Sequence, residues 1–312
     1  MSIRVGTCSW ADEALSKHFY PPKLPARDRL AWYAEYFDTV EVDSTYYRLP
    51  SESMVEGWAE RTPPGFVMHV KAFGLMTRHP VKLEVLPEDL RAEMPVDERG
   101  RVDRPPRELR GEVFRRFLEA LEPLRRAGKL GGILMQLPSY VVFKDRSFDY
   151  LEWAREQLGG DEMLVEFRHR SWLEEDERAD TFSFLERHGL SYVSVDSPRG
   201  NASNLMPRIA AATHPVAYVR FHGRNWRTWN LKGRTSAERF DWLYAREELE
   251  EWVDPLAELN ERSEEVYAML NNNRYDYAPQ SAKLLRDLLD EREIPATGAV
   301  EPPETDQLSL VT

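Results

Sequence analysis

The chain has 312 residues, of which 42% are hydrophobic, so it can bury a large core as two domains or as one barrel-sized domain. Its formal net charge of -12 repels polyanions at long range, which disfavours non-specific nucleic-acid binding, although local basic clusters can override this average. The single cysteine excludes a disulfide within these residues and a multi-cysteine zinc site, and it fits a reducing compartment.

The first residues run directly into a strand pattern and lack the charged and apolar regions of a secretory signal. No stretch of about eighteen apolar residues is present, so we expect no membrane span and no membrane partner. These features predict a cytoplasmic protein. They do not indicate an oligomeric state.

Eight apolar segments that end in polar residues recur along the chain with the alternation of β-strands. They are residues 3–10, 39–45, 66–72, 131–138, 163–167, 191–196, 216–223 and 266–273. Segments with a helical apolar face separate most of them, although the helix after 191–196 is short or missing. This order predicts an α/β fold, a single-domain (β/α)8 TIM barrel. A doubly wound sheet is the alternative, but its polar strand ends would concentrate at one switch point.

The predicted barrel domain spans residues 1–292 and includes an insertion after the third strand. Residues 86–108 are charged, rich in proline and without apolar periodicity, and arginines recur through them. The insertion could form a lid over the barrel, although such a loop is more often solvated. Residues 293–312 are rich in Pro, Glu and Thr and are expected to form a disordered tail.

Polar residues at the strand ends are predicted to meet, because the C-terminal ends of all strands in a TIM barrel converge on one mouth. The predicted ring consists of Glu41, Asp43, Lys71, Gln136, Glu166, Arg168, Asp196, Arg220, His222, Asn271 and Asn272. Buried charges are costly unless they pair, so a self-neutralising network that closes the barrel is the structural alternative.

Glu41 and Glu166 are the predicted acid/base pair, because carboxylates on different strands can have different environments and pKa values. We expect Arg168 to keep one carboxylate ionised, while the other is drier and carries a proton. His222 is the third catalytic candidate, as a general acid or base or as a neutral donor. A packed histidine satisfied by a neighbour is the alternative for it.

Cationic, amide and aromatic side chains complete the predicted site. The predicted substrate-binding residues are Lys71, Gln136, Arg168, Arg220, Asn271, Asn272, Trp226 and Trp229. The three cations would bind a phosphate or carboxylate group. The two tryptophans alternate with basic residues after the seventh strand, so they either stack on a nucleotide-like ligand or pack their loop onto the barrel.

No cofactor is predicted, but a divalent metal is a competing interpretation of the same ring. Its candidate ligands are Glu41, Glu166, Asp196 and His222, which are residue types that bind such ions. The interleaved Lys71, Arg168 and Arg220 argue against a metal, because a cluster of cations weakens attraction for another cation.

Several short motifs occur in a fixed order along the chain. They are GTCSW at 6–10, FYP at 19–21, TVEVDSTYYRLP at 39–50, QLP at 136–138, EFRHRSW at 166–172, YVRFHG at 218–223 and NN at 271–272. With these motifs the chain resembles the YecE-like domain-of-unknown-function family, number seventy-two, over about residues 3–290. The resemblance implies a TIM barrel and brings no agreed activity. The chain departs from the family in three places: the family usually has a glycine near Cys8, an asparagine near Asp43 and a shorter connection than 86–108.

The strand-end charges favour an enzyme that uses acid/base chemistry on an anionic, phosphorylated or nucleotide-like small molecule at the mouth of the barrel. The second hypothesis is a nucleic-acid-binding protein or a metal-dependent phosphodiesterase like endonuclease IV, to whose barrel some family members have been likened. The third is a non-catalytic ligand-binding or scaffold barrel.

Overall fold

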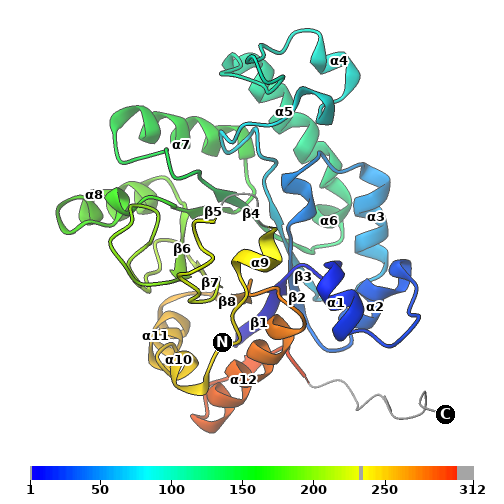
Figure 1. Ribbon diagram of the computed structural model, residues 1–312, viewed down its shortest axis with the longest axis vertical. Helices are drawn as coiled ribbons and strands as arrows, with labels where there is room; N and C mark the ends of the chain where they lie inside the picture. Colours follow the sequence, from blue (N-terminus) through cyan, green and yellow to red (C-terminus); the bar gives the residue numbers. More distant parts are fainter. Residues whose placement is uncertain (1, 232–234, 301–312) are drawn as a thin grey trace.

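The computed structural model describes residues 2–231 and 235–300, and its core is a closed barrel of parallel strands (Figure 1). The barrel strands are β1 Ile3–Cys8, β2 Thr39–Val42, β3 Val67–Lys71, β4 Leu130–Gln136, β5 Met163–Glu166, β6 Ser191–Asp196, β7 Val216–Phe221 and β8 Glu265–Leu270. They pair in chain order, and β1 closes the barrel by pairing with both β2 and β8. The predicted TIM barrel is confirmed.

Helices surround the strands in Figure 1. They are α1 Glu13–His18, α2 Arg29–Tyr33, α3 Glu52–Glu60, α4 Glu88–Arg91, α5 Arg107–Ala120, α6 Glu122–Arg126, α7 Asp145–Leu158, α8 Glu175–Arg187, α9 Ser236–Arg239, α10 Arg246–Glu250, α11 Val253–Arg262 and α12 Tyr277–Glu291. Short 3-10 turns lie at η1 Ala26–Asp28, η2 Ser44–Tyr46, η3 Leu83–Val85 and η4 Arg170–Trp172. As predicted, residues 197–215 between β6 and β7 contain no helix. Within the described residues, no helix combines the length and the apolar character needed to cross a bilayer.

The core has two parts, because successive strand residues point to opposite faces. One part packs between the strands and the helices, and the smaller part fills the barrel with Cys8, Leu134, Leu164, Val193, Val195, Tyr218, Tyr267 and Met269. Within this inner part the His69 ring lies 4.7 Å from the ring of Tyr218 and 4.2 Å from that of Tyr267. Burial lowers the pKa of His69 to about 3, so the inner core at this position is uncharged at neutral pH.

The insertion after β3 is folded rather than merely solvated. It contains α4 and an antiparallel bridge between Val96 and Val102, and a second bridge joins its Arg101 to Lys82; in Figure 1 it projects beside α5. Its buried apolar residues are Leu86, Leu90, Met94 and Val102. They come from different short elements, which explains why the sequence shows no single period there. Helix α5 begins at Arg107, inside the range expected for the insertion.

The barrel domain extends beyond the boundary expected at residue 292. Ala296–Thr297 form a ninth strand, β9, which pairs with the start of β1. Gly298 has a φ of 75° and packs so tightly that an added Cβ would lie 2.4 Å from the carbonyl oxygen of Val5. The barrel domain therefore includes residues beyond 292, at least as far as β9. Residues 301–312 of the expected tail lie outside the described residues.

Candidate active site at the mouth of the barrel

Arg220 on β7 is the centre of a buried charge network at the C-terminal ends of the strands. Its Nη2 donates to Oε1 of Glu41 on β2 at 2.6 Å, and its Nη1 donates to Oε2 of Glu166 on β5. All three side chains are 0% exposed. The alternation of the three strands brings these residues to the inner face, where one guanidinium bridges two carboxylates.

Glu166 accepts four hydrogen bonds. In addition to the bond from Arg220, its Oε1 accepts from Nε2 of Gln136 at 2.8 Å and from Nη1 of Arg168 at 2.9 Å. The Nε2 of His222 lies 3.2 Å from the same oxygen. Burial raises the pKa of Glu166, but Arg220 and His222 outweigh burial and hold the pKa well below its usual range. Glu166 is therefore a permanent carboxylate at neutral pH.

Glu41 lies in a different environment, with fewer donors. Besides Arg220, it accepts a hydrogen bond from the hydroxyl of Tyr218 at 2.9 Å. Burial raises the pKa of Glu41 to about 7, although the charge of Arg220 opposes this shift. Burial also raises the pKa of the neighbouring Asp43, but Lys71, Arg220 and a hydrogen bond with Glu41 lower it overall. Glu41 can thus hold a proton near neutral pH beside an ionised Asp43.

His222 is fixed on three sides. Nδ2 of Asn271 lies 2.7 Å from its Nδ1, and with this amide as the donor, Nε2 carries the proton that is donated to Glu166. Its ring stacks on Phe240 with a centroid distance of 5.3 Å. Burial lowers the pKa of His222 to about 4, although Glu166 raises it. The imidazole is therefore a neutral donor at pH 7.

A cavity of about 630 Å³ lies above this network and is rich in cations and rings. Nζ of Lys71 lies 4.9 Å from the centre of the Tyr46 ring, and Cζ of Arg168 lies 4.9 Å from the centre of the Trp229 ring. Arg239 also lines the cavity, and none of its described lining residues is a carboxylate. This half of the mouth is suited to an anionic group.

A smaller cavity of about 260 Å³ continues from the first one and shares Lys71 and Gln136 with it. Asp12 and Asp43 line this half. Nζ of Lys71 forms an ion pair with Oδ1 of Asp43 at 3.2 Å. Burial and the nearby Asp43 raise the pKa of Asp12 to about 6. This half of the mouth therefore presents one ionised carboxylate and one that binds a proton close to neutral pH.

Two amide side chains also face the carboxylate half. Asn271 and Asn273 line the cavity, and Nδ2 of Asn273 donates to Oδ2 of Asp12 at 3.1 Å. The Oδ1 atoms of both asparagines are buried and accept no hydrogen bond from the described residues. These oxygens are suited to hydroxyl or amine donors on a ligand.

The structure divides the predicted ring into lining residues and buried residues. The predicted residues that line the two cavities are Asp43, Lys71, Gln136, Arg168, Asn271 and Trp229. Glu41, Glu166, Arg220 and His222 do not line either cavity and form the network beneath it. The three predicted catalytic residues, Glu41, Glu166 and His222, are therefore not placed to contact a ligand in either cavity.

Asp196 and Asn272 point away from the mouth, contrary to the predicted ring. Asp196 accepts from Trp252 at 2.8 Å and from Arg224, which places it between β6 and the outer helices. Nδ2 of Asn272 donates to Oγ of Ser281 in α12 at 2.9 Å. Both residues tie helical segments to the barrel, so the binding role predicted for Asn272 is corrected.

The predicted tryptophan platform is divided as well. Trp229 is 7% exposed and lies within the cationic half of the mouth. Trp226 is 68% exposed, contacts Arg227 and lines neither cavity. Only one of the two rings is placed to contact a ligand in the mouth.

The alternative metal ligands do not converge on one position. Asp196 lies on the outer face of its strand, and the Arg220 guanidinium occupies the space between Glu41 and Glu166. Across residues 2–231 and 235–300, no group of three or more His, Cys, Asp and Glu side chains is arranged to hold a metal ion.

Sequence reasoning missed several polar residues of the mouth, among them Asp12, His79, Arg239 and Asn273. Asp12 and His79 lie in loops after strands, where no alternation predicts their direction. Ser9, which precedes Asp12, has a φ of 93°, a strained conformation of the kind that is concentrated at functional sites. The sequence did show that these residues follow strands, and the loops after the strands of a TIM barrel build its functional site.

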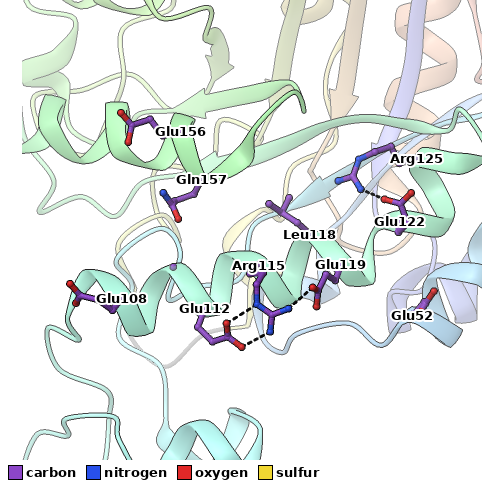
Figure 2. Close-up of a pocket in the computed structure, with 11 residues that line it drawn as sticks. Glu52, Glu108, Glu112, Arg115, Leu118, Glu119, Glu122, Arg125, Glu156 and Gln157 are labelled. Carbon is purple, nitrogen blue, oxygen red and sulfur yellow. Dashed lines mark hydrogen bonds and ion pairs between the residues drawn. The ribbon is translucent and has the colours of Figure 1, made fainter.

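A further hollow, of about 820 Å³, lies on the outside of the barrel between α5 and α7 (Figure 2). Six of its lining residues are glutamates, and four of these, Glu52, Glu112, Glu119 and Glu122, pair with arginines. Arg115 donates to Glu112 and Glu119, and Arg125 donates to Glu122. No buried strand residue reaches this hollow, which distinguishes it from the mouth.

Comparisons with known proteins agree with this architecture. UPF0759 protein YunF of Bacillus subtilis is 30% identical over 291 residues, which cover 92% of this chain and 95% of that protein. The crystal structure of a DUF72 family protein from Thermotoga maritima is similar with a TM-score of 0.74 and 32% identity, covering 93% of this chain and 100% of that chain. A DUF72 protein from Enterococcus faecalis, 23% identical, has the same fold with a TM-score of 0.75 over 92% of this chain and 95% of that chain. The family described as "Protein of unknown function DUF72" matches residues 4–306, and the chain belongs to this family.

Proposed function

We propose that this protein is an enzyme that uses acid/base chemistry on an anionic small molecule with hydroxyl groups. The observation that carries the proposal is the division of one continuous mouth into a cationic half and a carboxylate half. A ligand whose anionic group occupies the first half would place its neighbouring atoms beside the carboxylates of the second. Binding of the anionic group would then hold the reacting atoms within reach of the carboxylates, as acid/base catalysis requires.

Lys71 and Arg168 are the proposed anion-binding residues. Each forms an ion pair with a carboxylate, Lys71 with Asp43 and Arg168 with Glu166, and each lies against an aromatic ring. These contacts fix the two cations before a ligand arrives, which lowers the entropy cost of binding. The unpartnered amide oxygens of the carboxylate half would accept hydrogen bonds from hydroxyl groups of the same ligand.

Asp43 and Asp12 are the proposed groups that exchange protons with the ligand. Asp43 is the ionised member and would accept a proton as the base, while Asp12, with a pKa of about 6, would donate one as the acid. Glu41, which is hydrogen-bonded to Asp43, would act as a buried proton store. Glu166 and His222 would orient the groups above them rather than contact the ligand.

The charges in and beneath the mouth predict a pH dependence of anion binding. They are Asp12, Glu41, Asp43 and Glu166 on one side and Lys71, Arg168, Arg220 and Arg239 on the other, so their sum is zero when all are ionised. Protonation of Glu41 makes the sum positive. Because the pKa of Glu41 is raised to about 7, anion affinity should increase as the pH falls through 7 and decrease above it.

A ligand screen by thermal unfolding tests the proposal. Sugar phosphates and nucleoside monophosphates are compared with the same sugars and nucleosides without phosphate. A ligand at about one hundred times its dissociation constant adds about 2.7 kcal/mol of stability. With roughly 2.1 cal/mol/K of unfolding entropy for each of 312 residues, this corresponds to a melting-temperature increase of about 4 °C. Stabilisation by phosphorylated compounds alone is expected, and equal stabilisation by their neutral counterparts would contradict the proposal.

Variants then separate binding from chemistry. Lys71→Gln and Arg239→Gln should weaken binding of the stabilising compound, whereas Asp43→Asn should keep binding and lose turnover. Arg227→Gln is the matched control, because Arg227 is exposed and lines neither cavity. Glu41→Gln should bind sulfate with an affinity that does not change between about pH 7 and 8.5, a range above the pKa of about 6 of Asp12. A wild-type affinity that is equally constant over this range would refute the role given to Glu41.

A further inference from the structure

Another cavity, of about 860 Å³, adjoins the mouth and lies outside the site proposed above. It lies between the segment after β3, the start of α5 and the start of α7, and it shares His79 and Tyr140 with the cationic half of the mouth. The hydroxyl of Tyr140 donates to the backbone oxygen of Arg78, which connects the two cavities through one ordered contact. We name this cavity the arginine cleft.

The arginine cleft is lined by six arginines and one carboxylate. They are Arg78, Arg101, Arg104, Arg107, Arg110 and Arg146, with Asp103. Arg101 is neutralised by Asp97, to which it donates at 2.9 and 2.7 Å, and Arg104 lies 3.8 Å from Asp103. Among the described residues, the other four arginines form no ion pair with a carboxylate: Arg78, Arg107, Arg110 and Arg146. Their positive charge is therefore available to a ligand.

Aromatic rings hold these arginines in place. The guanidinium carbons of Arg78 and Arg110 lie 5.2 and 5.3 Å from the centre of the same ring, that of Tyr150. The guanidinium carbon of Arg107 lies 5.6 Å from the centre of the Trp153 ring. Cation–π contacts of this kind position like charges close together without neutralising them. The buried Nε of Arg110 also has no acceptor among the described residues.

Two helices begin at the arginine cleft. Arg107 is the first residue of α5, and Arg146 is the second residue of α7, and each helix has 14 residues. The residues before them, Pro106 and Lys144, provide no side-chain cap. Free backbone N–H groups and the positive end of the helix dipole therefore add to the arginine charges, an arrangement that favours phosphate groups.

We propose that the arginine cleft is a second binding site for a phosphate-class oxyanion, one with several negative charges such as a pyrophosphoryl group. Arginine forks bind phosphate oxygens in pairs, and four unpaired forks match a group with more than one charge. The net charge of the chain is -12, so its overall field does not attract such an anion and the local cluster must. The site does not depend on the chemistry proposed for the mouth.

The same oxyanion could reach the arginine cleft from two sources. It could be a free anion that occupies the cleft alone, or it could be the distal group of a ligand that also fills the mouth. The residues shared by the two cavities, His79 and Tyr140, make the second source sterically possible. Inorganic pyrophosphate and a hexose bisphosphate are therefore the two probes.

Isothermal titration calorimetry on the whole chain tests the site. Arg107→Gln/Arg146→Gln removes two exposed, unpaired charges of the cleft, so folding should be unaffected. Arg126→Gln/Arg187→Gln removes two exposed arginines elsewhere and is the control for net charge. We expect the strongest pyrophosphate-binding event of wild type and control to be at least about tenfold weaker in the cleft variant, which is about 1.4 kcal/mol, and to be kept in Arg239→Gln of the mouth.

Other outcomes would overturn the site. They are absence of pyrophosphate binding to wild type up to roughly 10 mM, equal affinity of the cleft variant and control, or loss of binding in Arg239→Gln of the mouth alone. Loss of bisphosphate binding in both the cleft variant and Arg239→Gln supports a cleft that binds the distal group of a mouth ligand. Loss in the cleft variant alone supports a separate site. Failure of the proposed function would leave pyrophosphate binding to the cleft unchanged, so the two proposals can fail independently.

Discussion

Replacement of Arg220 by methionine tests the charge network beneath the mouth most directly. Methionine fills a similar volume but leaves Glu41 and Glu166 without the guanidinium that bridges them. Breaking a buried ion pair by removing one partner costs about 3–5 kcal/mol, because the remaining charge stays buried. At roughly 0.65 kcal/mol/K of unfolding entropy for a chain of this length, a loss of about 4 kcal/mol lowers the melting temperature by about 6 °C at pH 8.

The pH dependence of this loss gives a second, independent readout. In the wild type the pKa of Glu166 is depressed, so its contribution to stability is present above its unfolded pKa and is lost only as the pH falls through the lower folded value. In Arg220→Met both carboxylates should have raised pKa values and cost stability when they ionise. The difference in unfolding free energy between wild type and variant should therefore decrease from pH 8 to pH 5, by about 1.4 kcal/mol for each unit by which a pKa differs.

Urea unfolding at several pH values measures this difference, and Arg246→Met provides the matched control. Arg246 pairs with Glu250 and Glu291 on the surface, where all three side chains are about half exposed, so its loss should cost far less stability than the loss of Arg220. A cost below about 1 kcal/mol for Arg220→Met, or a cost that is the same at pH 5 and pH 8, would refute the interpretation of a dry, paired network.

Two further predictions concern protonation and packing. In protein labelled with carbon-13 at the glutamate carboxyls, one signal should titrate near pH 7, because burial raises the pKa of Glu41. This signal should be missing in Glu41→Gln. A Glu41 signal that titrates near about 4.3 would contradict the assignment. Gly298→Ala should destabilise the fold more than Gly100→Ala in denaturant unfolding. Both glycines have a positive φ, which costs alanine about 1–2 kcal/mol. An added Cβ at Gly298 would also meet Val5, whereas one at Gly100 meets no atom. Equal losses of stability would show that β9 is loosely packed.

The alternation of strand residues predicted the inner face of most strands, because a strand inside a TIM barrel has only two faces. Glu166 and Arg168 share a face and bond to each other, as their spacing of two requires. The same rule forbids Asn271 and Asn272 from sharing a face, and the structure separates them. Asp196 was misplaced because every residue of β6 is buried, so burial does not distinguish its inner face from its outer face.

Depth and loop direction could not be predicted in this way. Periodicity placed Glu41 and Arg220 on the inner face but could not show that they lie below the cavity instead of lining it. Asp12 and His79 follow strands in irregular segments, where backbone angles such as the positive φ of Ser9 decide the direction of the chain. The folded insertion depends on contacts between short elements that carry no period of their own. The arginine cleft combines residues from three segments, so its charge becomes visible only in three dimensions.

The buried network and the exposed site are parts of one arrangement, so the structural and catalytic interpretations of the strand-end charges do not exclude each other. Gln136 and Arg168 line the mouth, yet both bond to Glu166 beneath it, and Glu166 is in turn fixed by Arg220. Desolvating these charges costs stability, and hydrophobic residues of similar volume would close the barrel at a lower cost. Such residues could not hold a guanidinium and an amide in fixed orientations at the floor of a cavity. Preorganised polar groups of this kind are what binding and transition-state stabilisation require, so the proposed function would account for the charges in a fold that could close with an apolar layer.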